Sequence, residues 1–290
     1  FVAVGGELLQ CSIRGRFFEE DRASPVVVGD RVLVQVGPTE GVIEAVLPRT
    51  SRIAKPSGRD GRTQIVAANV DLLVIVASLA SPALRPGVID RFLVIAEREA
   101  IAPLVVINKL DLDAAAQANT MAERYRRLGY DVLLTSIVTQ AGVSDLRARL
   151  EGHTSLFVGH SGVGKSSLLN RVDDRLRLRV AEVSSKHGKG KHTTTSVQLL
   201  GLGNDTYVVD SPGVREIQVP DMPQSSELGF CFPEIRALAP QCRYPNCTHS
   251  HEPSCAVKQA AEAGAIERER FASYLRILAG DGRQPRHDSF

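Results

Sequence analysis

The sequence predicts an α/β fold in three parts: an N-terminal OB-like β-barrel, a central domain with a mostly parallel sheet, and a C-terminal helical domain that binds metal. Short apolar stretches separated by turns fill the first part, which is typical of a small barrel. Buried strands then alternate with helical patterns, as in a doubly wound sheet. Cysteines and a histidine gather near the C-terminus. We place the three domains at residues 1–65, 66–220 and 221–290.

The composition indicates a soluble globular protein. Of its 290 residues, 43% are hydrophobic and 23% are charged, which allows a sizeable core. The longest apolar run, Leu72 to Ala77, is too short to span a membrane, and no signal peptide is recognised. We therefore expect a cytoplasmic protein with no membrane partner, and we expect a few residues to precede Phe1. Five cysteines, three of them close to a histidine, favour metal binding in a reducing compartment over disulfides.

Strands of the N-terminal barrel are expected at 11–17, 26–36 and 41–47, and a Gly-Asp turn divides the second stretch. A mobile loop or linker is expected at 57–63, which is rich in glycine and polar residues. OB-like barrels often bind RNA on one face. The basic residues of this part would suit RNA phosphates, although a solvated surface is the alternative. They are Arg14, Arg16, Arg49, Arg52 and Lys55.

The central domain begins near residue 68, where continuous apolar runs alternate with helical spacing. Such runs are expected for parallel strands, because both faces of a parallel sheet are buried. The expected strands are 72–77, 102–107, 132–135, 155–158 and 206–209. Helices are expected at about 88–96, 114–128 and 143–150, and after residue 166.

Residues 159–167 match the phosphate-binding loop pattern GxxxxGK[ST]. Glycines let backbone N–H groups approach an anion where a Cβ would block them, and the N-terminus of the following helix favours negative charge. Lys165 can reach the β- and γ-phosphates, and the Ser166 hydroxyl can ligate Mg²⁺. We take the whole loop as the candidate nucleotide site. Its residues are Gly159, His160, Ser161, Gly162, Val163, Gly164, Lys165, Ser166 and Ser167.

Asn108-Lys109-Leu110-Asp111 directly follows a buried strand and has the NKxD pattern of a guanine-reading loop. The Asp111 carboxylate can accept from N1–H and from the exocyclic amine of guanine, whereas adenine offers no such donor pair. The Lys109 stem can lie along the base, and Asn108 can tie this loop to the phosphate loop. A chance tetrapeptide before a helix cap is the alternative. Thr135-Ser136-Ile137, after the next strand, is a weaker candidate for a backbone contact to the base oxygen.

A basic segment lies between Arg175 and His192, where six Lys or Arg residues against one Glu give a local charge of +5. Its glycines and charge predict a mobile loop that ends in His192-Thr193-Thr194-Thr195. A threonine of this loop would complete the Mg²⁺ shell when the γ-phosphate is present, which would make the loop a switch. Thr193 and Thr194 are the candidates, and the sequence does not decide between them.

Asp210-Ser211-Pro212-Gly213 follows another strand and has the DxxG pattern. Asp210 would lie near Mg²⁺ and the Gly213 N–H near the γ-phosphate, a simple β-turn being the alternative. In ordinary GTPases the phosphate loop comes first and NKxD last, whereas here NKxD precedes the phosphate loop. This order indicates a circular permutation, which a parallel sheet tolerates when the chain ends lie close together.

Three cysteines and one histidine near the C-terminus have the spacing Cys-x4-Cys-x-His-x5-Cys. Three thiolates and one imidazole form a closed tetrahedral set for structural zinc. The predicted ligands are Cys242, Cys247, His249 and Cys255. His251 is a rival ligand, and unpaired surface cysteines are the alternative to a metal site. Cys11 and Cys231 are expected to be small buried residues, and a last helix near Tyr274 precedes a disordered tail at 280–290.

Taken together, these motifs resemble those of the RsgA (YjeQ) family, which are GTPases dependent on the small ribosomal subunit. The likeness covers nearly the whole chain. Besides the loops above, it includes Val28-Gly29-Asp30, Ala68-Asn69-Val70-Asp71, Ile89-Asp90-Arg91 and Cys247 to Pro253. Lys191, Ser211 and Ile137 depart from the family pattern, which usually has Arg, Thr and Ala at these positions.

The resemblance implies a cytoplasmic, monomeric GTPase that acts late in maturation of the 30S subunit and binds 16S rRNA near the decoding region. It also implies hydrolysis of GTP to GDP and phosphate, stimulated by the subunit. One structural zinc ion and a Mg²⁺ ion with the nucleotide would be the cofactors.

Many small GTPases place Gln just after DxxG to orient the attacking water, but this chain has Val214 there. We therefore expect slow intrinsic hydrolysis. The catalytic candidates are Lys165 and His192, which resembles the family's switch histidine; contact of His192 with phosphate or rRNA alone is the alternative. Two other functions stay open: a nucleotide-regulated RNA-binding module whose hydrolysis is incidental, and a P-loop kinase, against which NKxD argues.

Overall fold

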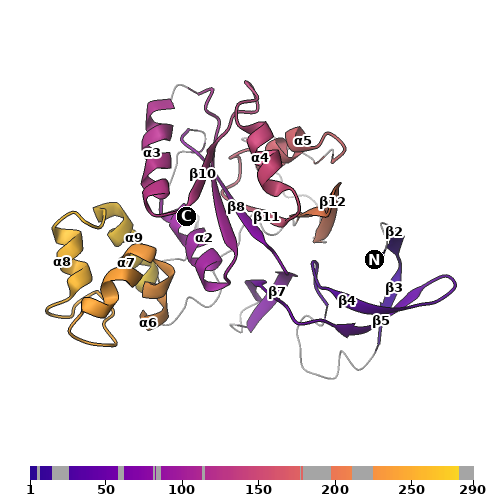
Figure 1. Ribbon diagram of the computed structural model, residues 1–290, viewed down its shortest axis with the longest axis horizontal. Coiled ribbons are helices and arrows are strands. Elements are labelled where there is room, and N and C mark those ends of the chain that lie inside the picture. The colour runs from indigo at the N-terminus through magenta and orange to yellow at the C-terminus, as the bar shows by residue number, and fades with distance from the viewer. Residues whose placement is uncertain are drawn as a thin grey trace, which may run out of the picture.

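The computed structural model describes residues 1–4, 7–14, 26–57, 62–80, 82, 86–112, 115–176, 178, 197–210 and 225–280. It confirms the predicted fold class, with N-terminal strands, a central α/β part built on a mostly parallel sheet, and a C-terminal helical region (Figure 1). Within these ranges, no helix is both long and apolar enough to cross a membrane. The tail expected at 280–290 lies, apart from its first residue, outside the described residues.

In the described part of the chain, the central sheet has the strand order β10-β9-β8-β11-β13-β12. Its strands are β8 (Leu72–Ser78), β9 (Ala102–Asn108), β10 (Asp131–Leu134), β11 (Thr154–Val158), β12 (Gln198–Gly203) and β13 (Thr206–Asp210). Neighbouring strands run parallel except for β12 and β13. The carboxyl ends of the parallel strands therefore meet at one edge, which is where sheets of this kind bind ligands.

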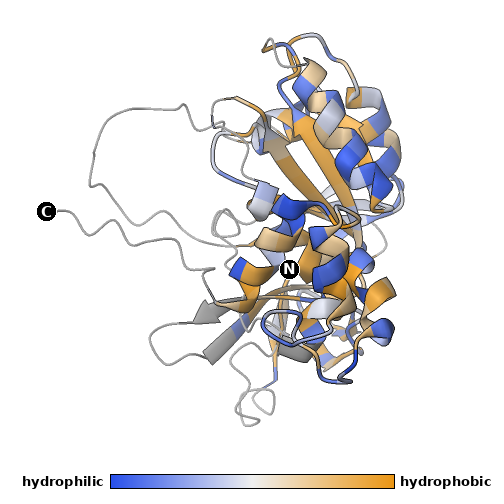
Figure 2. Cartoon of the chain, turned by 90° about the vertical axis from the view of Figure 1, so that its left-hand side faces the viewer, coloured by the Kyte–Doolittle hydropathy of each residue, from blue (hydrophilic) through white to orange (hydrophobic). Residues whose placement is uncertain are grey.

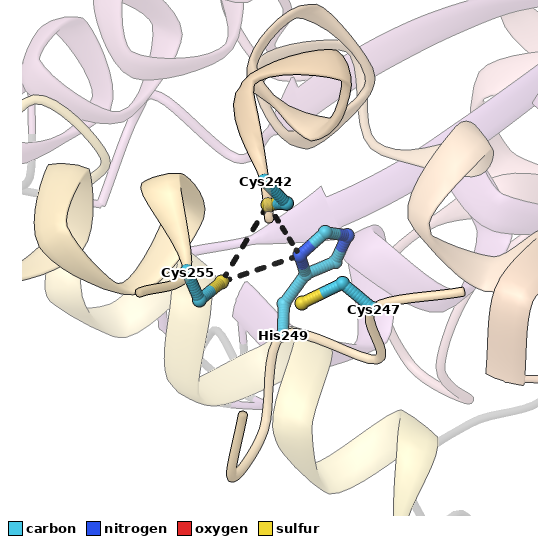
Figure 3. A group of neighbouring side chains, drawn as sticks. All are labelled: Cys242, Cys247, His249 and Cys255. Atoms are coloured by element: carbon cyan, nitrogen blue, oxygen red, sulfur yellow. Dashed lines mark hydrogen bonds between the residues drawn. The ribbon is translucent and has the colours of Figure 1, made fainter. Parts of the chain in front are cut away.

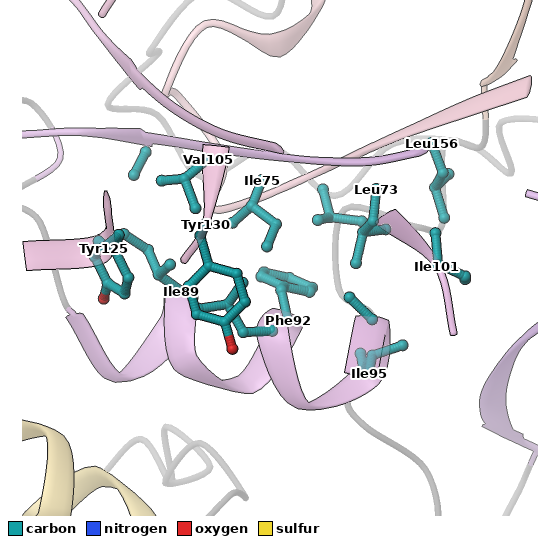
Figure 4. Packing of buried hydrophobic residues seen from close by; sticks show 14 of the residues in the cluster. Leu73, Ile75, Ile89, Phe92, Ile95, Ile101, Val105, Tyr125, Tyr130 and Leu156 are labelled. Carbon is teal, nitrogen blue, oxygen red and sulfur yellow. The ribbon is translucent and has the colours of Figure 1, made fainter. Parts of the chain in front are cut away.

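Helices cover both faces of this sheet. They are α2 (Pro86–Arg98) and α3 (Ala115–Arg127) on one face, and α4 (Val143–Leu150) and α5 (Lys165–Val172) on the other. Along β8, Leu73 and Ile75 pack toward α2 and α3 (Figure 4), whereas Leu72 and Val74 pack with α4 and α5. The apolar run is continuous because each face needs its own buried side chains. Figure 2 shows the hydrophobic strands between helices with hydrophilic outer faces.

The N-terminal strands form small sheets. Their pairs are β1 (Val2–Val4) with β2 (Glu7–Leu9), β5 (Gly41–Val46) with both β3 (Cys11–Ile13) and β4 (Val32–Val36), and β6 (Arg52–Ser57) with β7 (Arg62–Ala68). The loop expected at 57–63 is shorter than predicted, because β6 extends to Ser57 and β7 begins at Arg62. These two strands form an antiparallel hairpin that the sequence pattern did not indicate.

Two motifs noted in the sequence meet where the N-terminal strands join the central sheet. The Asn69 side chain donates to the Gly29 carbonyl oxygen at 2.8 Å. Gly29 has φ +87°, and a Cβ there would lie 2.1 Å from the Ala68 carbonyl oxygen. Asp30 accepts hydrogen bonds from two Arg49 nitrogens at 2.7 and 2.8 Å. Arg49, a candidate for RNA contact, is thus engaged within the fold and its side chain is only 16% exposed.

The C-terminal helical region has a small core of its own. Its elements are α6 (Ser225–Leu228), η2 (Gly229–Cys231), α7 (Pro233–Leu238), η3 (Ala239–Gln241), α8 (Ala256–Glu262) and α9 (Arg268–Leu278). Phe232 and Tyr274 lie in this core with ring centroids 5.3 Å apart, in an edge-to-face arrangement. Val94 of α2 belongs to the same cluster, so the region packs against α2 beside the central sheet (Figure 1).

A buried polar network also joins this region to α2. Arg270 of α9 donates to Asp90 of α2 at 2.5 Å and to Glu234 of α7 at 2.7 Å. The Tyr125 hydroxyl of α3 donates to the same Asp90 oxygen at 3.1 Å. The Arg270 and Asp90 side chains are 1% and 0% exposed. Asp90 of the Ile89-Asp90-Arg91 motif therefore connects three helices.

Candidate functional site

The phosphate loop joins the end of β11 to the start of α5, at the carboxyl edge of the sheet. Gly159, Gly162 and Gly164 have φ values of +136°, +84° and +99°, which residues with a Cβ rarely adopt. A Cβ at Gly159 would lie 2.0 Å from the Val76 carbonyl oxygen, and a Cβ at Gly164 would lie 2.4 Å from the Asn108 amide nitrogen. The path of the loop therefore requires these glycines, which agrees with a loop whose backbone approaches an anion.

Lys165 and Ser166 lie in the first turn of α5. The Lys165 ammonium donates to the carbonyl oxygens of Gly159 at 2.7 Å and His160 at 2.9 Å, so it folds back over the loop. Phosphate oxygens are stronger acceptors for this ammonium than neutral carbonyls, because the hydrogen bond is then charge-assisted on both sides. The positive end of the α5 dipole points to the same place. The loop therefore suits a polyphosphate.

Asn108 links the NKxD loop to the phosphate loop, as the sequence suggests. Its side-chain amide donates to the Val163 carbonyl oxygen at 2.9 Å. Its carbonyl oxygen accepts from the Thr135 hydroxyl at 3.0 Å, and the Leu110 N–H donates to the Thr135 carbonyl oxygen at 3.2 Å. Asn108 and Thr135 are fully buried. Three loops at the carboxyl edge are thus held in one arrangement.

Asp111 is the exposed carboxylate of this arrangement. The buried Ser136 hydroxyl donates to its Oδ1 at 2.5 Å, which fixes the orientation of the carboxylate. The backbone bends here too, since Lys109 has φ +66°. The sequence suggested a backbone contact for Thr135-Ser136-Ile137 and missed the role of the Ser136 side chain. Only the folded chain shows that residues 111 and 136 meet.

Several predicted site residues cannot be compared with the structure. His192, Thr193, Thr194 and Gly213 lie outside the described residues. The backbone of Asp210 ends β13, next to the phosphate-loop strand β11, at the expected edge of the sheet. The strand before it, β12, was not predicted.

The four predicted metal ligands come together in the C-terminal helical region (Figure 3). Their ligand atoms lie within 4.8 Å of one another. The Cys242 sulfur is 3.8 Å from the Cys255 sulfur, and His249 Nδ1 is 3.6 Å and 3.4 Å from these two sulfurs. A tetrahedral zinc ion with bonds of about 2.3 Å to sulfur and about 2.0 Å to nitrogen would separate two sulfurs by about 3.8 Å and sulfur from nitrogen by about 3.5 Å. The donor set and its spacing therefore fit zinc.

Burial of these ligands affects their protonation. It raises the pKa of the Cys247 thiol and lowers the pKa of His249, because charged forms are poorly solvated there. A cation at the centre would favour the thiolate and the neutral imidazole, which are the ligand forms. His251 is not in this group: its side chain is exposed, and its Nδ1 pairs with the Ser250 hydroxyl at 2.9 Å. Cys231 is buried as expected, and burial raises its pKa to about 11. Cys11 was also expected to be buried, but it is only partly buried.

The fold and these loops define a class of protein. A parallel sheet carries a phosphate loop after β11 and an NKxD loop after β9, two strands away. That is the arrangement of a P-loop GTPase, and NKxD precedes the phosphate loop along the chain. The class is therefore a circularly permuted GTPase.

Comparison with known proteins identifies the family. Residues 46–220 match the family model of the RsgA GTPase. The small ribosomal subunit biogenesis GTPase RsgA of Moorella thermoacetica is 40% identical over 280 residues, which cover 96% of this chain and 92% of that protein. The crystal structure of YjeQ from Thermotoga maritima superposes with a TM-score of 0.79 at 36% identity, covering 96% of this chain and 92% of that one. YloQ, a circularly permuted GTPase, gives a TM-score of 0.74 at 32% identity and covers 97% and 89%. The chain belongs to the RsgA GTPase family.

Proposed function

We propose that this GTPase binds the small ribosomal subunit and assists its late maturation, hydrolysing GTP to GDP and phosphate. The observation that carries the proposal is the joint arrangement of the phosphate loop and Asp111, linked through Asn108 and oriented by Ser136. The family supplies the setting, since curated relatives of similar length are named small ribosomal subunit biogenesis GTPases.

In this proposal each loop has a separate task. Asp111 reads guanine through N1–H and the exocyclic amine, Lys109 lies along the base, and Leu110 keeps the loop in place. Residues 159–167 cradle the phosphates, with Lys165 as the positive charge at the β- and γ-phosphates. Ser166, Asp210 and one of Thr193 and Thr194 would hold Mg²⁺, whose charge balances that of the phosphates. The Gly213 N–H would contact the γ-phosphate, and His192 would position the attacking water.

A zinc ion held by the three cysteines and His249 is the proposed structural cofactor. The tetrahedral spacing of the donors and the burial of three of them support it. Its role would be to hold together a loop that has few apolar residues of its own. Cysteines that bind a metal and form no disulfide suit a reducing cytoplasm, which is where we place the protein.

We infer that the protein is a monomer with three domains, at residues 1–65, 66–220 and 221–290. The central domain would hydrolyse GTP, and the first and last domains would bind 16S rRNA. Of the basic candidates in the described N-terminal residues, Arg14 and Arg52 are exposed enough for such contacts, although Arg14 also pairs with Glu44. Phosphate contacts of this kind would make binding sensitive to salt.

The test is GTP hydrolysis by the full chain with and without purified 30S subunits, using 50S subunits and ATP as controls. Stimulation by 30S alone, on GTP alone, is the expected result. Tight subunit binding with equal affinity in GDP and in a non-hydrolysable GTP analogue would instead favour an RNA-binding module whose hydrolysis is incidental. Absence of both stimulation and subunit binding would contradict the proposal.

A further inference from the structure

The loop that carries the metal ligands has an unusual backbone. It runs from Cys247 to Cys255, and two of its non-glycine residues, His249 and Ser254, have φ values of +57° and +53°. Each such residue costs about 1 kcal/mol or more and persists only where its surroundings fix the conformation. His249 is itself a ligand and is only 3% exposed. Something must therefore hold the backbone on both sides of this histidine.

The Glu252 carboxylate lies at the centre of this loop and accepts hydrogen bonds from both sides of His249. Its Oε1 accepts from the Thr248 N–H at 2.7 Å and from the Thr248 hydroxyl at 2.6 Å. Its Oε2 accepts from the Ser250 N–H at 3.1 Å and from the His251 N–H at 3.3 Å. The residues before and after the histidine are thus tied to a single side chain.

The carboxylate is well suited to this role. Burial alone would raise its pKa, but the hydrogen bonds from Thr248 lower the pKa of Glu252 to about 2. It is therefore ionised at neutral pH, and hydrogen bonds to a charged acceptor are the stronger kind. Glu252 is not among the grouped metal ligands of the described residues. Because both oxygens are used by the loop, it acts on the metal through His249.

The other side of the loop is fixed to α9. The Tyr274 hydroxyl donates to the Thr248 carbonyl oxygen at 2.7 Å, and the Tyr274 side chain is fully buried. Thr248 is thus held by Glu252 at its N–H and hydroxyl and by Tyr274 at its carbonyl. Such outer partners of metal ligands commonly set ligand orientation.

We propose that Glu252 is a positioning residue for the metal site, which holds the 248–251 backbone so that His249 Nδ1 and the neighbouring thiolates meet the ion in a tetrahedral arrangement. This inference rests on the proposed metal site. Removal of the carboxylate would release the N–H groups on both sides of His249, and the strained backbone would relax. Loss of one such outer partner commonly costs 10- to 100-fold in metal affinity.

The experiment compares Glu252→Ala and Glu252→Gln in the full chain with the wild type. Glu262→Gln, at an exposed glutamate of α8, is the matched control, and Cys255→Ser removes a ligand. Zinc release to a chromogenic chelator gives the dissociation rate, and the absorption spectrum of the Co²⁺-loaded protein reports the ligand geometry. Affinity for a fluorescent GDP analogue shows that the rest of the chain is folded.

Glu252→Ala is expected to release zinc 10- to 100-fold faster than the wild type and to alter the Co²⁺ spectrum, with unchanged GDP binding. Glu252→Gln keeps one acceptor oxygen and should give a smaller change in the same direction, so it decides the matter if the alanine variant does not fold. Wild-type release rates and spectra in both variants would overturn the inference while leaving the metal site intact. A wild-type chain that takes up neither zinc nor Co²⁺ would overturn the metal site and this inference with it.

Discussion

The ion pair between Arg270 and Asp90 offers a sharp test of how the C-terminal helical region is held to α2. Arg270 also donates to Glu234, and its guanidinium lies 4.2 Å above the centre of the Phe232 ring. Burial opposes the charged form, but Asp90 and Glu234 together raise the pKa of Arg270. The Arg270 guanidinium and the Asp90 carboxylate therefore each stabilise the charged form of the other. Replacing Arg270 with Met removes one charge and keeps much of the apolar volume.

The magnitude follows from burial. In Arg270→Met, Asp90 would keep a charge in a site that excludes water, where the Tyr125 hydroxyl still donates to it among the described residues. Breaking a buried pair in this way costs about 3–5 kcal/mol. The matched control is Arg236→Met, which breaks a pair with Glu97 across the same contact with α2. There the side chains are 49% and 19% exposed, so the expected cost is below about 1 kcal/mol.

Urea unfolding followed by circular dichroism would measure the loss of unfolding free energy for Arg270→Met, Arg236→Met, Asp90→Asn and the double variant Arg270→Met/Asp90→Asn. The double variant should lose clearly less than the sum of the single losses, because Asp90 no longer carries a buried charge when its partner Arg270 is removed. A loss for Arg270→Met no larger than that for Arg236→Met would refute the reasoning from burial. Strict additivity of the two single variants would refute the claim that the charges depend on each other.

Three further results are expected. Ser136→Ala should weaken GTP binding roughly tenfold in a fluorescent-nucleotide titration, because the Asp111 carboxylate loses the hydroxyl that orients it. A hydrogen bond to a charged group contributes about 1.5–3 kcal/mol, and we expect the low end because Asp111 is exposed. Unchanged affinity would contradict the role of the Ser136 hydroxyl. In the metal-loaded protein, a disulfide reagent at pH 8 should modify the partly buried Cys11 quickly and the buried Cys231 slowly. The Cys231 thiol has a pKa of about 11, so only about one part in a thousand is thiolate at that pH. A chelator should then expose three more reactive thiols, those of the metal ligands. Gly29→Ala should destabilise the chain by roughly 1–3 kcal/mol or more in urea unfolding. Gly129→Ala is the control, because Gly129 has a similar φ of +89° but open space where the Cβ would lie, and it should lose clearly less. Equal losses would show that the close approach of the backbone at residue 29 is easily relieved.

The central sheet was predictable from the sequence because its strands are buried on both faces. A short continuous apolar run such as Leu72–Ser78 predicts a parallel strand, because such a strand buries the side chains on both of its faces. The β6–β7 hairpin and β12 were not predicted. Strand β6 contains Lys55 and Pro56, and β12 contains two glycines and lies at the sheet edge, so neither pattern favours a strand. Pairing with β7 and with β13 determines these conformations.

The candidate sites also include features that were predictable from the sequence and contacts that were not. The phosphate loop, NKxD and the cysteine spacing were readable because each motif is nearly contiguous in the chain. The contact of Ser136 with Asp111 depends on two loops that follow neighbouring strands, and 25 residues separate them. The pair of Arg270 and Asp90 spans 180 residues. A single sequence gives no sign of which charges will be buried together, because burial of a charge is a property of the folded chain.

One helix connects the metal site to the nucleotide-binding part. Arg270 and Tyr274 lie four residues apart on α9, so they share one face of the helix. Tyr274 holds the metal loop at Thr248, and Arg270 holds Asp90 of α2. Helix α2 in turn follows β8, whose Val76 carbonyl lies against the first glycine of the phosphate loop. Because both anchors belong to a single rigid element, a change in the metal loop that shifts α9 must also act on the buried ion pair. A zinc ion bound in this position would therefore stabilise more than its own loop, since it would fix the helix through which the C-terminal region packs against α2.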